Sequence, residues 1–381
     1  DGGVDLGLEG EEGDAGLGAL AVAHEEDVAG VEGGRRGVGG GGVGEFGGEA
    51  DGGELVDGAS TMEVINPATE TVLALCPRAD EAQMEAAIQA AKAAFPAWSR
   101  RPIAQRRDLL LKLADTMDAQ QEDLARVLTQ EQGKPLGEAT TEVLWTALFI
   151  RGIASQELPV KILEDSETMR VEQHRLPLGV VGAIIPWNFP LLLMAFKLPA
   201  ALLAGNTIII KPAPTTPLAT LKIGEIMAGT FPAGVVNVVT DQNDLGGYLT
   251  QHPDVAKISF TGSSATGKKV MASAATSLKR LTLELGGNDA AIVLPGADPA
   301  SVAQGIFNGA FLNAGQVCIA VKRAYVHESI YDDVVDRLAA LAKQVVVGNG
   351  LDQGTTMGPI QNRMQYAKLK EFLEIARKDG R

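Results

Sequence analysis

Short apolar segments alternate with longer segments of helical periodicity between residues 180 and 285. The short segments are rich in Val and Ile and cover residues 180–185, 207–211, 235–240, 257–261 and 281–285. Helical patterns lie between them at residues 189–204, 217–228 and 264–275, with a shorter one near Leu245. Strands that alternate with helices form a mostly parallel sheet that is covered on both faces. The sequence therefore predicts an α/β fold, in which ligands bind outside the carboxyl ends of the strands.

The segment before this alternation predicts a hairpin followed by helices. Residues 63–75 contain two β-rich runs separated by an Asn-Pro turn. Asp80 and Gln83 have the spacing of a capping box and mark the start of a helix. Pro102 is expected at the first position of the next helix, which would run toward Gly133.

Residues 157–178 depart from the helical pattern that precedes them at residues 138–156. They are charged, lack a helical apolar stripe and alternate loosely. This pattern predicts an extended hairpin that stands off the body of the molecule. Such a hairpin either contacts another subunit or is a plain surface hairpin, and the sequence leaves both interpretations open.

Residues 1–61 differ in composition from the rest of the chain. Residues 1–60 contain 21 of the 45 glycines, and their 15 acidic side chains and 2 arginines account for −13 of the total net charge of −15. Without a periodic apolar pattern this segment cannot offset its backbone entropy, so we expect disorder. Ordered sequence is expected from Met62, where we also expect translation to start naturally. The rest is nearly neutral and offers no basic surface to nucleic acid or to anionic lipid.

Two patterns resemble known elements but lack their context. Residues 37–42 match the dinucleotide fingerprint GxGxxG, but no predicted strand precedes them and no predicted helix follows. We attribute this match to composition. Residues 176–196 are uncharged and long enough to span a bilayer, yet three prolines divide them. They predict a strand, a turn and the start of a helix, and we expect no membrane partner.

Polar residues follow the predicted strands at the edge where a ligand is expected. Asn188 lies between two prolines, where its amide could donate to an oxyanion or cap the following helix. Lys211 ends an isoleucine run and either binds oxygens such as ribose hydroxyls or extends to solvent. Glu284 lies among apolar strand residues, where desolvation would suit a general base at neutral pH.

The turn after the fourth predicted strand is rich in small residues. Residues 262–269 match GxxxxGK, but Lys269 stands where a P-loop requires Ser or Thr to hold Mg²⁺. A nucleoside triphosphatase is therefore disfavoured. Phosphate binding by a glycine-rich turn between a strand and a helix remains a hypothesis.

The two cysteines, Cys76 and Cys318, form no CxxC motif and no Cys/His cluster. This arrangement predicts neither a metal site nor a disulfide framework and is typical of a reducing, cytoplasmic compartment. Cys318 lies in a turn of small residues at 315–320, where a thiol is either an inert core group or a nucleophile. The polar residues at the strand ends favour covalent capture of a carbonyl by Cys318, with a dinucleotide that accepts hydride.

Five motifs carry a resemblance to a known family. PWNFP, KPAPTTP, FTGSSATG, LELGGN and GQVCIA occur in this order, and together they resemble the NAD(P)-dependent aldehyde dehydrogenase superfamily from about Met62 to the last residue. The resemblance implies an aldehyde-dehydrogenase-like α/β fold. A Rossmann-like cofactor domain would cover residues 62–156 and 179–284, an oligomerisation hairpin residues 157–178, and an incomplete α/β catalytic domain residues 285–381.

The same resemblance implies oxidation of an aldehyde with NAD or NADP, no metal ion, and a homodimer or homotetramer in the full-length protein. Cys318 corresponds to the nucleophile that forms a thiohemiacetal, Asn188 and the Cys318 backbone N–H to its oxyanion hole, and Glu284 to the base that activates water. Lys211 corresponds to a ribose-binding lysine and Ser263 to the residue that meets the pyrophosphate. The implied cofactor-binding set is Ile184, Pro186, Trp187, Lys211, Pro214, Phe260, Thr261, Gly262, Ser263, Leu285 and Gln365.

Two departures from the family pattern qualify these expectations. Pro214 stands where many NAD-preferring members have Glu, so the choice between NAD and NADP stays open. The sequence ends at Arg381, before the family's EEIFGP-like motif and its final strand. We therefore expect a truncated chain with little or no turnover, whose full-length parent oxidises aldehydes.

Three questions about function remain open at this point. A CoA-acylating aldehyde dehydrogenase is disfavoured because a thiol acceptor does not need Glu284 as base. A non-catalytic dinucleotide-binding or interaction protein would have an inert Cys318. An apolar or aromatic aldehyde is favoured over the semialdehyde of a dicarboxylic acid by uncharged neighbours of the expected site, namely Leu191, Leu192, Phe311, Val317 and Ile319.

Overall fold

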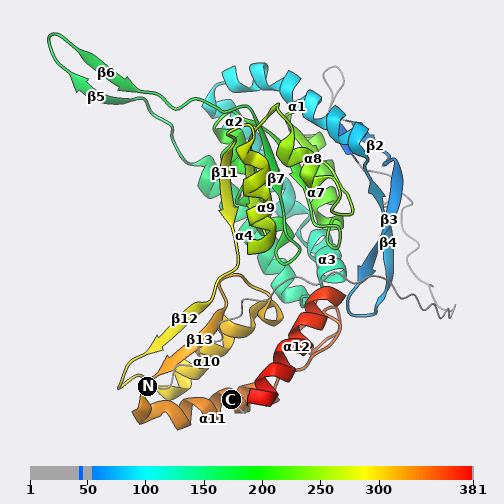
Figure 1. Ribbon diagram of the computed structural model, residues 1–381, viewed down its shortest axis with the longest axis vertical. Helices are drawn as coiled ribbons and strands as arrows, with labels where there is room; N and C mark the ends of the chain where they lie inside the picture. The colour runs from blue at the N-terminus through cyan, green and yellow to red at the C-terminus, as the bar shows by residue number, and fades with distance from the viewer. Residues whose placement is uncertain (1–42, 46–53, 380–381) are drawn as a thin grey trace.

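The computed structural model describes residues 43–45 and 54–379. At its centre lies a five-stranded sheet with the order β11-β10-β7-β8-β9, in which all neighbours are parallel (Figure 1). The strands are β7 (Val180–Ile184), β8 (Thr207–Lys211), β9 (Val236–Val238), β10 (Val255–Thr261) and β11 (Arg280–Glu284). The predicted α/β fold is confirmed. Because the chain adds β8 and β9 on one side of β7 and β10 on the other, the strand order reverses between β7 and β10.

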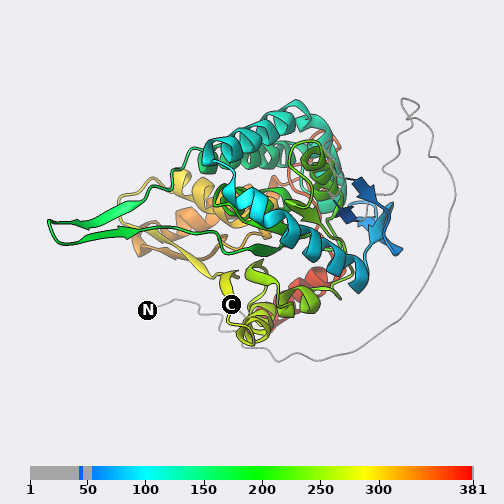
Figure 2. The same ribbon diagram turned by 90° about the horizontal axis from the view of Figure 1, so that it is seen from above.

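Helices cover both faces of this sheet (Figures 1 and 2). One core contains residues of α2 (Ile103–Ala119), α3 (Gln121–Gln132), α4 (Leu136–Ala154), α5 (Pro190–Ala195), α6 (Leu198–Leu203) and α7 (Leu218–Ala228). The opposite core contains residues of α1 (Glu81–Arg100), α8 (Gly246–Gln251) and α9 (Ser264–Ala275). Since side chains alternate along a strand, Ile208 and Ile210 of β8 join the first core and Ile209 joins the second.

The predicted start of α1 is confirmed, whereas the following helix differs from its prediction. Asp80 and Gln83 form a capping box. Pro102 is the N-cap of α2 rather than its first helical residue, because its ψ of 140° is extended. The helix predicted to reach Gly133 is divided into α2 and α3 at Gln120, whose φ of −110° and ψ of 19° are not helical.

The hairpin predicted near residue 66 consists of β3 (Ser60–Asn66) and β4 (Thr71–Arg78). Order begins before Met62, because β2 (Glu54–Val56) pairs with β1 (Val43–Glu45). The Gln83 side chain accepts from the Ala59 N–H at 2.9 Å and donates to the Asp57 carbonyl at 2.8 Å. Disorder over residues 1–61 is therefore wrong for 43–45 and 54–61. Residues 1–42, with the GxGxxG match at 37–42, and residues 46–53 lie outside the described residues.

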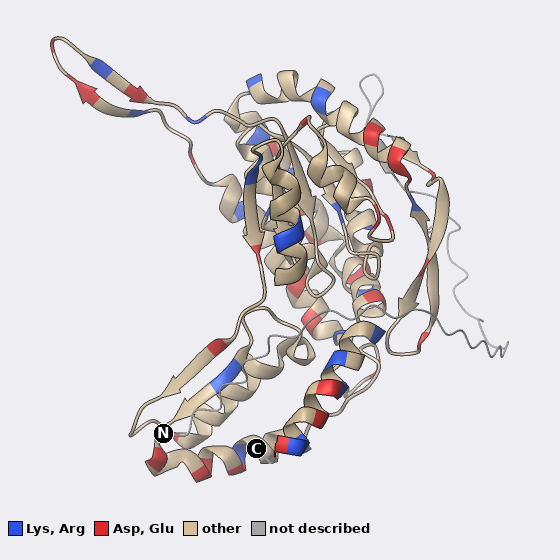
Figure 3. Cartoon of the chain, in the orientation of Figure 1, with Lys and Arg blue, Asp and Glu red and all other residues tan. Residues whose placement is uncertain are grey.

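The segment 157–178 forms a hairpin that stands away from the body, as predicted (Figures 1 and 2). It consists of β5 (Lys161–Asp165) and β6 (Arg170–Gln173) and carries charges of both signs (Figure 3). Arg170 pairs with Asp165 at 2.9 Å and with Glu172 at 2.8 Å. Ile162 and Leu163 are exposed on the same hairpin.

A smaller part of the chain follows β11. It contains the parallel pair β12 (Asp289–Val293) and β13 (Val321–Val326), α10 (Pro299–Phe311), α11 (Tyr331–Lys343) and α12 (Arg363–Asp379), with short 3₁₀ segments at Leu312–Gly315 and Glu328–Ile330. Val293, Ile306 and Val334 form its core. None of the helices in the described ranges is long and apolar enough to cross a membrane.

Candidate active site

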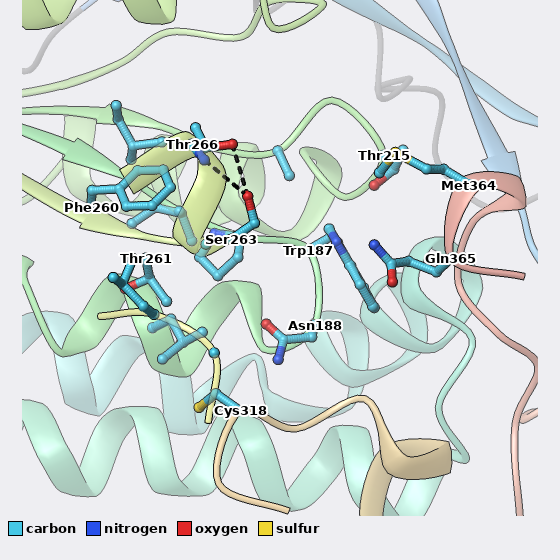
Figure 4. A pocket seen from close by; sticks show the side chains of 18 of the residues that line it. Trp187, Asn188, Thr215, Phe260, Thr261, Ser263, Thr266, Cys318, Met364 and Gln365 are labelled. Atoms are coloured by element: carbon cyan, nitrogen blue, oxygen red, sulfur yellow. Dashed lines mark hydrogen bonds between the residues drawn. The ribbon is translucent and has the colours of Figure 1, made fainter. Parts of the chain in front are cut away.

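A cleft of about 1110 Å³ opens at the carboxyl ends of the parallel strands, where the strand order reverses between β7 and β10. This is the position at which open α/β sheets bind ligands. The structure brings every predicted site residue except Glu284 to the lining of this cleft (Figure 4). These residues are Ile184, Pro186, Trp187, Asn188, Lys211, Pro214, Phe260, Thr261, Gly262, Ser263, Leu285, Cys318 and Gln365.

Cys318 reaches the cleft through an unusual backbone turn. Asn313, Ala314 and Gly315 have φ values of 52°, 55° and 77°, so three successive residues are left-handed. This conformation costs about 1–2 kcal/mol for a residue such as Ala314, and strain of this kind is typical of functional sites. Cys318 itself is half-buried, and its carbonyl accepts from the Lys322 ammonium at 2.9 Å. The sulfur is therefore held at a cleft wall and is not enclosed in the core.

Asn188 lies next to this turn. Figure 4 shows its side chain between Cys318 and Trp187, with Gln365 on the far side of the indole. Asn188 Nδ2 donates to the Gln316 carbonyl at 2.9 Å. The N-cap of α5 is Phe189, without a side-chain capping bond, so the helix-cap interpretation of Asn188 is wrong.

A buried ion pair that the sequence did not reveal holds the Asn188 segment. Lys134 Nζ lies 2.5 Å from Glu142 Oε2, and both side chains are completely buried. The same ammonium donates to the Asn188 carbonyl at 3.0 Å, while Glu142 Oε1 accepts from the Leu191 and Leu192 N–H groups at the start of α5. Burial lowers the pKa of Lys134, and the Glu142 charge opposes that shift.

Asn313 connects the cysteine turn to the Asn188 segment and to helices α3 and α4. Its amide donates to the Asn188 carbonyl at 3.0 Å and its Oδ1 accepts from Gln132 Nε2 at 3.0 Å. The Asn313 backbone N–H donates to Glu138 at 3.1 Å, and burial raises the pKa of that carboxyl. The sequence contained one signal of the buried ion pair. Glu142 places a charge within the buried stripe of α4 that contains Ala139 and Val143.

Lys211 has a partner within the chain. Its ammonium lies 2.5 Å from Asp241 Oδ1, with 4% and 0% of the two side chains exposed. The expected oxygen-rich partner therefore includes a carboxylate, and the interpretation that the Lys211 side chain extends to solvent is wrong. Asp241 follows β9 by three residues, so the strand-end rule that selected Lys211 would have found it as well.

The glycine-rich turn between β10 and α9 directs a helix N-terminus at the cleft. Ser263 is the N-cap of α9, and its hydroxyl accepts from the Thr266 N–H at 3.1 Å (Figure 4). The Gly262 N–H donates to the Glu284 carbonyl at 3.0 Å, which fixes the turn against β11. The first amides of a helix have no carbonyl partner within it, so this turn favours an anion.

The expected desolvation of Glu284 is wrong. Its side chain is exposed because β11 is the edge strand of the sheet, and it does not line the cleft. Glu284 pairs in register with Thr261, whose hydroxyl accepts from Lys197 Nζ at 2.5 Å. Burial lowers the pKa of Lys197 to about 8, and the Glu284 charge opposes that shift.

Of the five apolar residues expected near the substrate, Leu192, Phe311 and Ile319 are partly or largely exposed and do not line the cleft. Val317 lines the cleft, whereas Leu191 is completely buried in the first core and cannot contact a ligand. Ile319 is 72% exposed and Phe311 is 46% exposed.

Replacing Gly287 by Ala is expected to displace the cysteine turn. A Cβ at Gly287 would lie 2.9 Å from the Cys318 carbonyl oxygen and 2.4 Å from Asp289 Oδ1. A contact below about 3.0 Å forces the backbone to move, so alkylation of Cys318 by iodoacetamide should change in rate at least about threefold. Gly286→Ala is the matched control, because its Cβ would meet nothing within 4 Å. Equal alkylation rates in both variants and in the unsubstituted chain would refute the predicted contact.

Comparisons with known proteins identify a family. The model of the aldehyde dehydrogenase family matches residues 55–381. A Pseudomonas protein named "Probable aldehyde dehydrogenase" is 44% identical over 330 residues, which cover 86% of this chain and 67% of the relative. Phenylacetaldehyde dehydrogenase of Pseudomonas fluorescens is 40% identical over 344 residues, which cover 86% of this chain and 68% of that protein.

The fold is also similar to solved structures. The NAD⁺ complex of aldehyde dehydrogenase from Bacillus cereus superposes with a TM-score of 0.84 at 37% identity, covering 87% of this chain and 69% of that one. The chain spans about two thirds of the length of these relatives. The fold, the cleft and these similarities agree, and the chain belongs to the aldehyde dehydrogenase family, a class of NAD(P)-dependent oxidoreductases.

Proposed function

We propose that the full-length protein oxidises an aldehyde to its carboxylic acid through a covalent intermediate on Cys318, and that the chain by itself turns over slowly. The observation that carries the proposal is that one cleft is lined by the thiol, the Asn188 amide and the N-terminus of α9. The Cys318 sulfur would bond to the carbonyl carbon while the carbonyl π pair moves to oxygen, which forms a thiohemiacetal. Departure of hydride then leaves a thioester, and water cleaves it to the acid and the free thiolate.

The oxyanion would be stabilised by two N–H donors. Within residues 43–45 and 54–379 the Cys318 backbone N–H has no hydrogen-bond acceptor, so it can donate to a substrate oxygen. Asn188 uses one of its two amide hydrogens on the Gln316 carbonyl, and the second can donate to the same oxygen. Donors fixed in place before the reaction stabilise the developing charge without reorganisation.

The residues of the cleft fit a dinucleotide. The turn at Gly262 and Ser263 would hold the pyrophosphate at the N-terminus of α9. Trp187 and Gln365 line the same cleft as Cys318, and the nicotinamide would bind in this part of it. When bound, NAD(P)⁺ supplies the hydride acceptor.

Release of the acid would use Glu284 as the base that activates water. Its exposed carboxylate lies one residue before Leu285, which lines the cleft, and its charge acts on Lys197. With CoA as the acyl acceptor this base is not needed. Hydrolysis in the absence of CoA therefore separates the proposal from a CoA-acylating enzyme.

An apolar or aromatic aldehyde is the proposed substrate class. Val317, an apolar residue, lines the cleft beside Cys318. Lys322 is the cation nearest in sequence to Cys318, but its ammonium donates to the Val317, Cys318 and Ala320 carbonyls. Phenylacetaldehyde should therefore acylate Cys318 faster than glutarate semialdehyde.

The division into domains also belongs to this proposal. Residues 62–156 and 179–284 would form the cofactor domain and residues 285–381 a part of the catalytic domain. The projecting hairpin at 157–178 exposes Ile162 and Leu163, which would be covered in a homodimer or homotetramer.

Asn188→Ala is expected to slow hydride transfer about 100-fold or more, because one donor to the oxyanion is lost. The test follows formation of reduced cofactor in a single turnover after the chain is mixed with NAD(P)⁺ and an aldehyde. Asn288→Ala is the matched control, since Asn288 is exposed and does not line the cleft. An Asn188→Ala chain that transfers hydride at the unsubstituted rate would refute the assigned role.

A further inference from the structure

A buried carboxylate stands behind the lysine at the end of β8. Asp241 is completely buried, its Oδ1 lies 2.5 Å from Lys211 Nζ, and its Oδ2 accepts from the Leu245 N–H at 2.8 Å. Both carboxylate oxygens therefore have partners, and the side chain is fixed. Lys211 lines the cleft and is itself only 3% exposed, with its stem next to Gly246 at the start of α8.

The Lys211–Asp241 pair lies where one ribose of a bound dinucleotide would be. The proposed pyrophosphate turn follows β10, and β8 is the second strand from β10 across β7. Two strand spacings are about 10 Å, so a ribose attached to the pyrophosphate reaches the end of β8. In α/β sheets a charged residue near this ribose selects between a 2′-hydroxyl and a 2′-phosphate.

The charge of the pair disfavours a phosphate. Lys211 and Asp241 together are neutral, and the remaining ammonium hydrogens can donate to neutral ribose hydroxyls without placing unbalanced charge in the cleft. A 2′-phosphate would add almost two negative charges beside a carboxylate that is already fixed by two hydrogen bonds. Repulsion between like charges a few ångströms apart in a partly buried site is strong enough to determine binding.

Other cations line the cleft, and binding of a 2′-phosphate by one of them is the alternative to selection by Asp241. Lys269 on α9, Lys368 on α12 and Lys322 after the cysteine turn are part of the lining. Lys322 donates to three carbonyls of the cysteine turn, so it is already engaged. If Lys269 or Lys368 received the 2′-phosphate, the chain would bind NADP at least as tightly as NAD.

We propose that Asp241, acting through Lys211, makes the cleft selective for NAD over NADP. The inference rests on the proposed dinucleotide site and adds the identity of its ligand. It supplies a carboxylate from the loop after β9, where Pro214 leaves none on the segment after β8.

Direct binding tests the inference without any turnover. The purified chain is titrated calorimetrically with NAD and with NADP, and NAD should bind about tenfold or more tightly. Asp241→Asn removes the charge with little change in shape, so it should reduce this preference by about tenfold. Asp241→Ser is a second variant with the same expected direction. Asp244→Asn is the matched control, because Asp244 lies on the same loop but is 46% exposed and pairs with Arg78 at the surface.

Three outcomes would overturn the inference. Equal binding of NAD and NADP by the unsubstituted chain contradicts it directly and needs no variant to fold. An unchanged preference in folded Asp241→Asn and Asp241→Ser chains shows that another residue selects the cofactor. Binding of neither dinucleotide would refute the proposed dinucleotide site itself and the inference with it, a result distinct from the first two.

Discussion

Iodoacetamide at pH 8 is expected to alkylate Cys318 in the folded chain at least about 1000-fold faster than Cys76. Cys76 is completely buried in the core beside β3, and burial raises the pKa of its thiol to about 12, so almost none of it is thiolate at this pH. Cys318 lies half-buried on the wall of an open cleft. The two residues are measured in one reaction by mass spectrometry of their peptides.

Two comparisons make this result specific. In concentrated urea both thiols lose their folded environments, and their rates should become equal within about threefold. A Cys318→Ala chain should take up no label while folded. Equal labelling of both cysteines in the folded chain, or an unreactive Cys318, would contradict the assigned positions and would favour a non-catalytic binding protein.

Glu142→Gln is expected to lower the free energy of unfolding by about 3–5 kcal/mol, because it leaves the Lys134 charge buried without its partner. The substitution also weakens the acceptor for the Leu191 and Leu192 N–H groups, which start the helix next to Asn188. Urea unfolding monitored by circular dichroism gives the difference from the shift in midpoint.

Two further variants distinguish the cost of leaving one buried charge unpaired from the effect of losing an ion pair. Glu122→Gln breaks an exposed pair with Arg126 on α3, where the Glu122 side chain is 82% exposed, and should leave stability unchanged. The double variant Lys134→Met with Glu142→Leu removes both charges and should recover part of the loss. A Glu142→Gln chain as stable as the unsubstituted one would show that the pair is not the anchor of this segment.

Much of the sheet could be predicted from the sequence, because the apolar strands at 180–184 and 207–211 contrast clearly with the helices between them. The strand-end rule selected Asn188, Lys211 and Glu284, and the first two line the cleft. Local periodicity and the position of a ligand at the edge of a parallel sheet are both short-range properties of the sequence, which is why these predictions succeeded.

The features of the site that the sequence did not predict depend on contacts between distant segments of the chain. Lys134 and Asn188 meet although 54 residues separate them, and Gln132 meets Asn313 across 181 residues. The exposure of Glu284 follows from the edge position of β11, which is decided by strand order and not by the apolar residues around it. No local pattern encodes these relations.

In the proposed reaction the Cys318 sulfur captures the aldehyde carbon. The most direct measurement mixes the chain with NAD(P)⁺ and phenylacetaldehyde, quenches with acid within one turnover, and locates any adduct by peptide mass spectrometry. We expect a phenylacetyl group on Cys318, with one equivalent of reduced cofactor per acylated chain and neither product in the Cys318→Ala variant. Reduced cofactor formed at an undiminished rate by Cys318→Ala, or an acyl group found on another residue, would contradict it.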